Sequence, residues 1–121
     1  MIRLLPGFPE NVVAVAAAGH VTREDYETVL IPHVEAVAKN HPKIRCYYEL
    51  GAEFAGMAPG AMWEDFRIGV EYWTNWERVA VVTDISWIAR SVAAFRFLMP
   101  GRIRVFPLSE NQAARTWVEA P

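Results

Sequence analysis

Short apolar runs alternate along the chain with longer segments whose apolar residues recur at helical spacing. Five runs predict strands, at residues 2–6, 11–19, 43–50, 77–84 and 102–106. Four segments predict helices, at residues 22–39, 61–76, 85–101 and 109–118. The order β-β-α-β-α-β-α-β-α predicts a single α/β domain over residues 1–121, with a mostly parallel five-stranded sheet and helices mainly on one face.

The first and last predicted helices carry boundary signals. Thr22 is expected to cap the first helix, with Asp25 three residues later as in a capping box. Pro32 lies inside this segment, and we expect a kink or a break there because proline removes a backbone donor. Ser109 is expected to cap the last helix.

Two predicted strands alternate between apolar and charged side chains. The third strand carries Ile44, Cys46, Tyr48 and Leu50 on one side and Arg45, Tyr47 and Glu49 on the other. The fifth strand places Arg102, Arg104 and Phe106 on one side. Parallel strands covered on both faces are ordinarily continuous apolar runs. We therefore expect one face of the sheet to be covered incompletely, or by a partner chain.

The segment at residues 61–76 is amphipathic. One stripe of its helical wheel holds Met62, Phe66, Gly69, Val70 and Trp73. The opposite side holds Glu64, Arg67, Glu71 and Asn75.

The segment at residues 85–101 has two apolar stripes. The first, which we expect to face the core, holds Ile85, Ile88, Ala89, Val92, Phe95 and Met99. The second, almost opposite, holds Trp87, Ala94 and Leu98. Asp84, Arg90 and Arg96 interrupt the segment too often for a membrane span. Because a helix that is apolar on two sides is buried on two sides, the second stripe predicts a homo-oligomer, most simply a two-fold dimer with Trp87, Ala94 and Leu98 in the contact.

Composition narrows the class of protein. The 121 residues are 53% hydrophobic and 21% charged, which indicates one globular domain rather than a disordered chain. A formal net charge of −2 gives no support for nucleic-acid binding. Cys46 is the only cysteine, so no intramolecular disulfide can form. No secretory signal is recognised and no apolar run reaches the roughly 20 residues of a membrane span, so we expect a cytoplasmic protein.

Common catalytic and cofactor motifs are absent from the sequence. It has no phosphate-binding glycine loop, no paired-cysteine motif and no zinc-protease or nucleophile-elbow motif, and we expect no cofactor and no metal. The histidines His20, His33 and His41 have no second ligand at metal spacing. A catalytic pairing of Cys46 with His20 stays open, although nothing in the sequence marks it.

Three carboxylates lie at or just after the ends of predicted strands, where open α/β sheets bind ligands. They are Glu49, Glu53 and Asp84. General acid–base catalysis is one interpretation, and it requires the groups to lie close together with shifted pKa values. For Asp84, capping of the following helix is the favoured interpretation.

The segment between Gly51 and Gly60 contains three glycines with Phe54 and Met57. A lid over an apolar pocket is one interpretation, and a loop pinned to the core by Phe54 is the favoured one. If a small hydrophobic ligand binds, the candidate contacts are Phe54, Met57, Trp63, Phe66 and Trp87.

Charge is distributed unevenly along the chain. The middle holds Glu49, Glu53, Glu64, Asp65, Glu71 and Glu77, whereas residues 85–109 hold no acid and include Arg90, Arg96, Arg102 and Arg104. Neighbouring elements that neutralise each other are the simplest interpretation. Complementary patches across a subunit boundary, or a site for an anionic lipid headgroup, are the alternatives.

The sequence resembles the SpoIIAA-like branch of the bacterial STAS-domain family. The resemblance lies in "YELGAEFAGMAPGAMWEDFRIG", "WERVAVVTDISWI" and "FRFLMPGRIRVFPLSENQAARTW", and it extends over nearly the whole chain. Signalling members of the family use a phosphorylatable Ser or Thr where the third strand meets the next helix. This chain has no Ser or Thr between Thr28 and Thr74, so that switch is not expected. Structural kinship with CRAL-TRIO lipid-transfer domains implies a hydrophobic ligand as an alternative.

These observations favour a non-enzymatic protein that acts through protein–protein contacts, including its own dimer. The alternative is a carrier or sensor of a small hydrophobic ligand. An enzyme that uses Glu49, Glu53 or Asp84 is a third class.

Overall fold

The computed structural model describes residues 1–96 and 101–121 and contains one five-stranded sheet in the order β1-β2-β3-β4-β5. β1 (Ile2–Leu4) pairs antiparallel with β2 (Val12–Val21). β3 (Ile44–Met57), β4 (Trp76–Thr83) and β5 (Arg102–Phe106) continue the sheet in parallel. The predicted α/β class and the mostly parallel sheet are confirmed.

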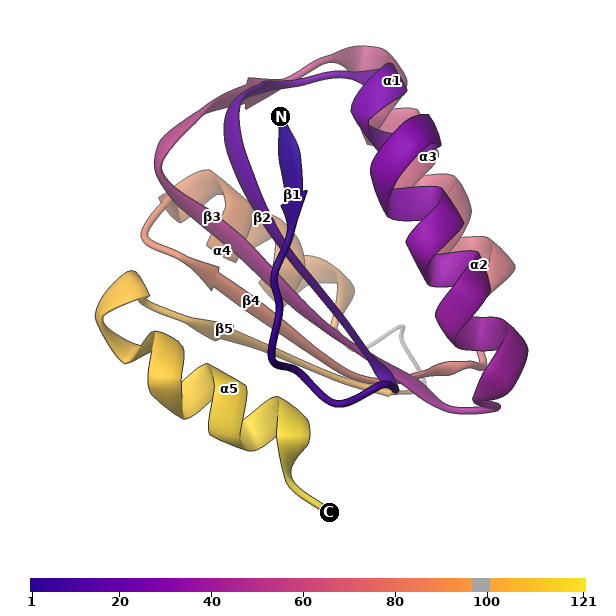
Figure 1. Ribbon diagram of the computed structural model, residues 1–121. Coiled ribbons are helices and arrows are strands. Elements are labelled where there is room, and N and C mark those ends of the chain that lie inside the picture. The colour runs from indigo at the N-terminus through magenta and orange to yellow at the C-terminus, as the bar shows by residue number, and fades with distance from the viewer. Residues whose placement is uncertain (97–100) are drawn as a thin grey trace.

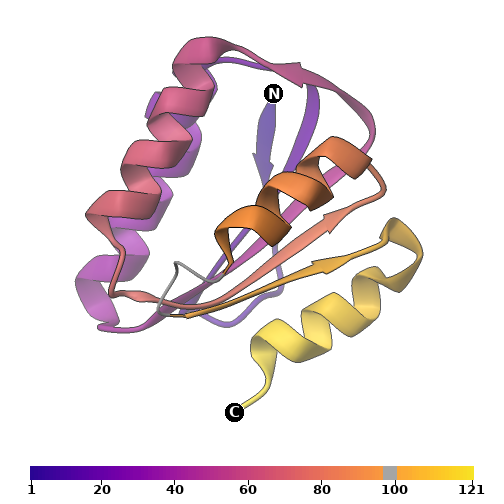
Figure 2. The same cartoon turned by 180° about the vertical axis from the view of Figure 1, so that it is seen from behind.

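The helices divide unequally between the two faces of the sheet (Figures 1 and 2). One face carries α1 (Arg23–Asp25), the π-helical turn η1 (Tyr26–Leu30), α2 (Ile31–Asn40), α3 (Pro59–Glu71) and α4 (Ser86–Phe95). The other face carries η2 (Leu108–Glu110) and α5 (Asn111–Glu119). Because each right-handed crossover joins neighbouring strands in the same direction along the sheet, the crossover helices all lie on one face.

The main core lies between the sheet and the crossover helices, as the alternation of the strands predicted. Ile44, Cys46 and Leu50 of β3 are buried there with Val13 and Val15 of β2. From the helical layer the core receives Tyr26, Leu30, Val34, Ile68 and Ile88. Tyr48 of β3 is half-buried and packs against this core.

The predicted capping box at the first helix is confirmed. The Asp25 amide donates to the Thr22 hydroxyl at 3.2 Å, and the Thr22 amide donates to the Asp25 carboxylate at 2.8 Å. The helix is not broken near Pro32. The wide π-helical turn η1 continues into α2 without interruption and places the proline in the first turn of α2. A proline costs no helical hydrogen bond in that position.

The expected loop between Gly51 and Gly60 is wrong. β3 continues through this segment to Met57, and Phe54 and Met57 are half-buried against the main core. Gly56 lies within β3 and has a φ of +144°, a backbone conformation that disfavours side chains, so glycine suits this position of the strand. The interpretation of this segment as a flexible lid is therefore wrong, since the residues up to Met57 belong to a long strand.

Two expectations about helix termini also change. Ser109 does not cap the last helix, because Pro107 precedes η2 and no side chain caps either η2 or α5. The third predicted helix is described only as far as Phe95, so Leu98 and Met99 lie outside the described residues.

The second face of the sheet is covered by the chain's own α5, but only in part, which agrees with the expectation of incomplete coverage. Ala114 and Val118 of α5 are fully buried against this face. The second core also contains Val12, Ala14, Tyr47, Ala80, Val82 and Phe106 from the strands. The outer parts of β5 stay open, since Arg102 and Arg104 are exposed.

The charged side chains on the second face bind the C-terminal end of α5. The buried guanidinium of Arg45 donates to the Val118 carbonyl at 2.9 Å and to the carbonyl of Ala120. Arg78 donates to the carbonyls of Trp117 at 2.8 Å and Ala120 at 2.9 Å. The Trp117 carbonyl also accepts from the Ala120 amide at 3.4 Å, and the carbonyls at this end of α5 form the negative end of the helix dipole. The two arginines therefore fix α5 to the sheet.

Replacing Arg45 with methionine should lower the free energy of unfolding by about 3 kcal/mol, because buried carbonyls and Glu77, 2.7 Å from Arg45, lose their cationic partner. Urea unfolding followed by circular dichroism measures this change. Arg102→Met is the matched control, since Arg102 is exposed on the same face, and its effect should stay within about 0.5 kcal/mol. Equal stabilities of the two variants would contradict the role of Arg45.

Candidate functional site

α3 presents a broad apolar surface to solvent. This surface, which we call the α3 face, consists of Met62, Trp63, Phe66 and Val70 of α3 and Trp73 of the turn that follows it, with exposed fractions of 52%, 59%, 61%, 55% and 38%. All but Trp63 belong to the apolar stripe found in the sequence. An apolar helical stripe normally faces the core, so this outward orientation is the most unusual feature of the structure.

A buried carboxylate explains why α3 is turned this way. Glu64 is only 3% exposed and accepts hydrogen bonds from Arg67 at 2.8 and 3.2 Å. The Arg23 guanidinium of α1 lies 3.6 Å from the same carboxylate. A side chain on Gly60 would come within 3.1 Å of Arg23, so the close approach of α3 to α1 needs glycine there. The inward side of α3 thus carries the charged group of Glu64 and its arginine partners beside the apolar Ala61 and Ile68.

A hydrogen-bonded cluster lies beneath α3. The fully buried Tyr26 hydroxyl donates to the Asp65 carboxylate at 2.7 Å and lies 2.9 Å from the Tyr48 hydroxyl. The Asp65 residue is exposed overall, and the partial removal of its carboxyl group from water at this contact raises its pKa, an effect that the Tyr26 hydrogen bond partly offsets. The pKa of Tyr26 is raised well above its usual value, chiefly by burial and then by the nearby Asp65.

The sequence reasoning did not single out this cluster, although one signal was available. Asp65 follows Ala61 by four residues and precedes Ile68 by three, so it adjoins two buried residues of the helix although it is itself exposed. Its partners Tyr26 and Tyr48 come from η1 and β3. Periodicity within one helix cannot identify such distant partners.

Cys46 is buried in the main core near this cluster, whereas His20 is exposed. Burial, with a smaller effect from Asp65, raises the pKa of the Cys46 thiol to about 12. A thiol with such a pKa is protonated at neutral pH and is a poor nucleophile. The structure therefore gives no support to a catalytic pairing of Cys46 with His20.

The α3 face contains a shallow hollow. Trp63, Phe66, Arg67, Val70 and Glu71 line it, and its volume is about 360 Å³. The rings of Trp63 and Phe66 stack with centroids 6.0 Å apart. Arg67 and Glu71 are 3.3 Å apart and supply one charge of each sign at its border.

The residues predicted to contact a ligand or a second subunit are distributed over three elements. Trp63 and Phe66 are brought together on α3, whereas Phe54 and Met57 lie along β3 and pack against the main core. Trp87 is 52% exposed on α4, and Ala94 of the same helix is exposed. The third predicted interface residue, Leu98, lies outside the described residues.

The three candidate carboxylates have separate structural surroundings. Glu49 accepts a hydrogen bond from the Tyr47 hydroxyl at 2.8 Å, and Glu53 is exposed. Asp84 accepts from the Leu108 amide at 3.0 Å. The expected capping of α4 by Asp84 is wrong, because the Ile85 amide donates to Thr83 instead, at 3.1 Å. In the described part of the chain, no group of three His, Cys, Asp or Glu side chains has the arrangement of a metal site.

Comparisons with known proteins agree with the fold. The profile of the SpoIIAA-like family matches residues 12–119, which is most of the chain. The protein belongs to the SpoIIAA-like family. The crystal structure of an uncharacterized DUF3478-family protein with a SpoIIAA-like fold from Shewanella loihica PV-4 is similar, with a TM-score of 0.79 and 22% identity over 97% of this chain and 93% of that chain. No curated protein matches significantly.

The resemblance found in the sequence is thereby confirmed for the family and the fold. At this identity the structural likeness concerns the fold alone. Among the described helices of this SpoIIAA-like protein, none is long and apolar enough to cross a membrane.

Replacing Asp65 with asparagine tests the cluster beneath α3. A carboxyl group whose pKa is raised by folding stabilises the native state at a pH below the unfolded value of about 3.9, and this contribution is lost as the pH rises through the folded pKa. Because asparagine cannot ionise, the stability of Asp65→Asn relative to wild type should increase between acidic and neutral pH.

Urea unfolding at several pH values measures this difference. Glu53→Gln is the control, because it removes an exposed carboxylate from β3 and reports the effect of changing the net charge alone. Parallel stability profiles for wild type and Asp65→Asn would show that folding does not shift the pKa of Asp65.

Proposed function

We propose that this SpoIIAA-like protein is a non-enzymatic binding protein that acts through protein–protein contacts, beginning with its own two-fold dimer. The observation that carries the proposal is the exposure of five large apolar side chains on the α3 face. Aromatic residues and methionine are enriched at the centres of protein interfaces, and contiguous exposed apolar patches mark interaction sites. Burial against a second protein removes this surface from water.

The charges beside the hollow suit a second copy of the chain. Arg67 and Glu71 lie one helical turn apart, and each directly follows a residue of the α3 face, Phe66 and Val70. If two copies of α3 cross in antiparallel orientation, Arg67 of each copy can approach Glu71 of the partner subunit. In a two-fold interface every contact between two residues occurs twice, once in each direction, and this pair of opposite charges fits that rule.

The second stripe of α4 supports a larger contact. Trp87 and Ala94 are exposed, and α4 lies on the same side of the sheet as α3 (Figure 2). The predicted participation of Trp87, Ala94 and Leu98 in the dimer is therefore retained in the proposal. An exposed tryptophan is a common anchor of protein interfaces.

Control by phosphorylation at the β3–α3 junction is not part of this proposal. The segment from Val29 to Trp73 contains no Ser or Thr, so it offers no aliphatic hydroxyl to a kinase. We also propose a cytoplasmic location, which suits a chain whose single cysteine is buried and unpaired.

A second candidate function is the binding of a small hydrophobic ligand. The hollow of about 360 Å³ on the α3 face favours it, since its size lies at the lower end of ligand pockets, which span about 300–1,000 Å³. Its floor is apolar, and Arg67 could contact an acidic headgroup. Phe54 and Met57 are less suited to this role than predicted, because they pack against the core.

The double variant Trp63→Ser, Phe66→Ser tests the dimer. Analytical ultracentrifugation of the wild type should show a dimer at micromolar concentration, and the variant should have a dissociation constant at least about tenfold higher, which corresponds to about 1.4 kcal/mol. Trp87→Ser is the matched comparison on α4, and a weaker dimer in that variant would place α4 in the contact as well.

A wild-type protein that stays monomeric at high micromolar concentration would exclude the self-association. Native mass spectrometry of the same preparation distinguishes the second candidate. A co-purifying lipid or fatty acid that is lost in the double variant would favour ligand binding over dimer formation.

A further inference from the structure

β5 forms an open edge of the sheet. It is the last strand in the sheet order, and no strand in the described residues pairs with its outer side. The outward N–H and C=O groups of an edge strand are therefore available to another extended chain. Proteins commonly use such an edge to bind a peptide as an added strand.

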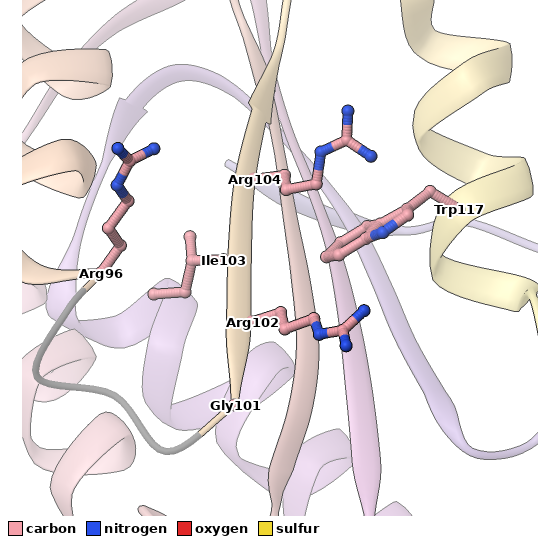
Figure 3. Close-up of a pocket in the computed structure, with 6 residues that line it drawn as sticks. All are labelled: Arg96, Gly101, Arg102, Ile103, Arg104 and Trp117. Atoms are coloured by element: carbon pink, nitrogen blue, oxygen red, sulfur yellow. The ribbon is translucent and has the colours of Figure 1, made fainter.

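The edge is bordered by a hollow of about 410 Å³, and its two sides differ in chemistry (Figure 3). Arg102, Arg104 and Trp117 lie on the side of α5, and Ile103 points to the opposite side, where Arg96 also lies. Ile103 and Val105 are half-buried against the main core. A strand added here would meet Arg102 and Arg104 on one side, and Ile103 together with Arg96 on the other.

The positive charges on the α5 side have no acidic partner in the described part of the chain. Arg102 and Arg104 are exposed and take part in no ion pair there. The Arg104 guanidinium lies over the rings of Phe106 and Trp117, at 4.8 and 5.4 Å from their centroids. These aromatic contacts orient the charge without neutralising it.

The same arginines disfavour pairing between copies of this chain. If two β5 strands met in antiparallel register, their arginines would face each other, and like charges directly opposite are destabilising. The other edge strand, β1, carries the exposed Arg3. Edge charges of this kind disfavour self-assembly and favour an acidic chain over a neutral or basic one.

We propose that β5 binds an extended acidic segment of another protein by strand addition. Acidic side chains at every second position would meet Arg102 and Arg104, and the apolar side chains between them would meet Ile103. Because successive side chains of a strand point to opposite faces, the arginines of β5 would favour a peptide whose acidic and apolar residues alternate. The surface is distinct from the α3 face, so the two contacts are independent.

A short fluorescein-labelled peptide that alternates glutamate and valine tests the proposal by fluorescence anisotropy. The wild-type protein should bind it, and the double variant Arg102→Ala, Arg104→Ala should bind at least about tenfold more weakly. Arg90→Ala is the matched control, because Arg90 is an exposed arginine of α4. The Trp63→Ser, Phe66→Ser variant should retain binding, which separates this site from the α3 face.

N-methylated peptides distinguish strand addition from simple charge attraction. In a strand, the amides of alternate residues point to opposite edges, so methylation of the glutamate amides and methylation of the valine amides block different edges. One of the two methylated peptides should lose binding and the other should keep it, although their charges are equal. Any other pattern contradicts strand addition.

Two further results would overturn the proposal. One is the absence of binding at millimolar peptide, and the other is unchanged binding to the double arginine variant. Nuclear magnetic resonance provides a positional check, since the amide signals of Arg102–Phe106 should shift on addition of the peptide.

Discussion

The order of the strands is the constraint on which the rest of this structure depends. Neighbouring parallel strands joined by right-handed crossovers send every crossover helix to the same face. The five strands of the sheet span about 19 Å, because adjacent strands are about 4.8 Å apart. Three helices side by side need about 18 Å between their outer axes. The helices of this face therefore fill the width of the sheet.

The position of α3 is set by its helical neighbours. α3 packs against α1 and η1 through Glu64, Ala61 and Ile68. Its apolar stripe faces solvent. The Tyr26–Asp65 hydrogen bond places polar groups beneath the helix. The exposed apolar surface thus follows from the packing of α3 and does not need a separate structural element.

The opposite face receives only α5, and this difference explains the arginines. A single helix leaves its C-terminal carbonyls over the sheet, and Arg45 and Arg78 donate hydrogen bonds to them. On β5 the helix covers Phe106, whereas Arg102 and Arg104 stay exposed. Arginines on one face of the sheet therefore have two roles, since those of β3 and β4 bind the end of α5 and those of β5 remain at the surface.

Much of this architecture could be predicted from the sequence, because strand alternation and crossover handedness are local rules. The buried side of β3 and the capping box at Thr22 are examples. The length of β3 could not be predicted, since Gly51 and Gly56 resemble loop residues until the pairing with β2 is known. Whether the apolar stripe of α3 faces the core is equally non-local.

Helical periodicity shows which side chains of α3 share a stripe, but it cannot show which stripe faces inward. Burial of Glu64 reverses the usual orientation, and it depends on Arg23 from a helix far away in the sequence. The same limit applies to the candidate binding surfaces. Trp63 and Phe66 are recognisable as large apolar residues, but their exposure follows from packing that no single segment encodes.

The α3 face and the β5 edge differ in the physics of binding. Contact through the α3 face buries apolar area, so its strength should vary little with salt. Contact through the β5 edge combines backbone hydrogen bonds with exposed arginines, so salt should weaken it. Because the two surfaces lie on different elements, a dimer formed through α3 leaves one open β5 edge on each subunit. A two-fold dimer would then have two identical β5 edges. A partner with two acidic segments would gain affinity by binding both edges.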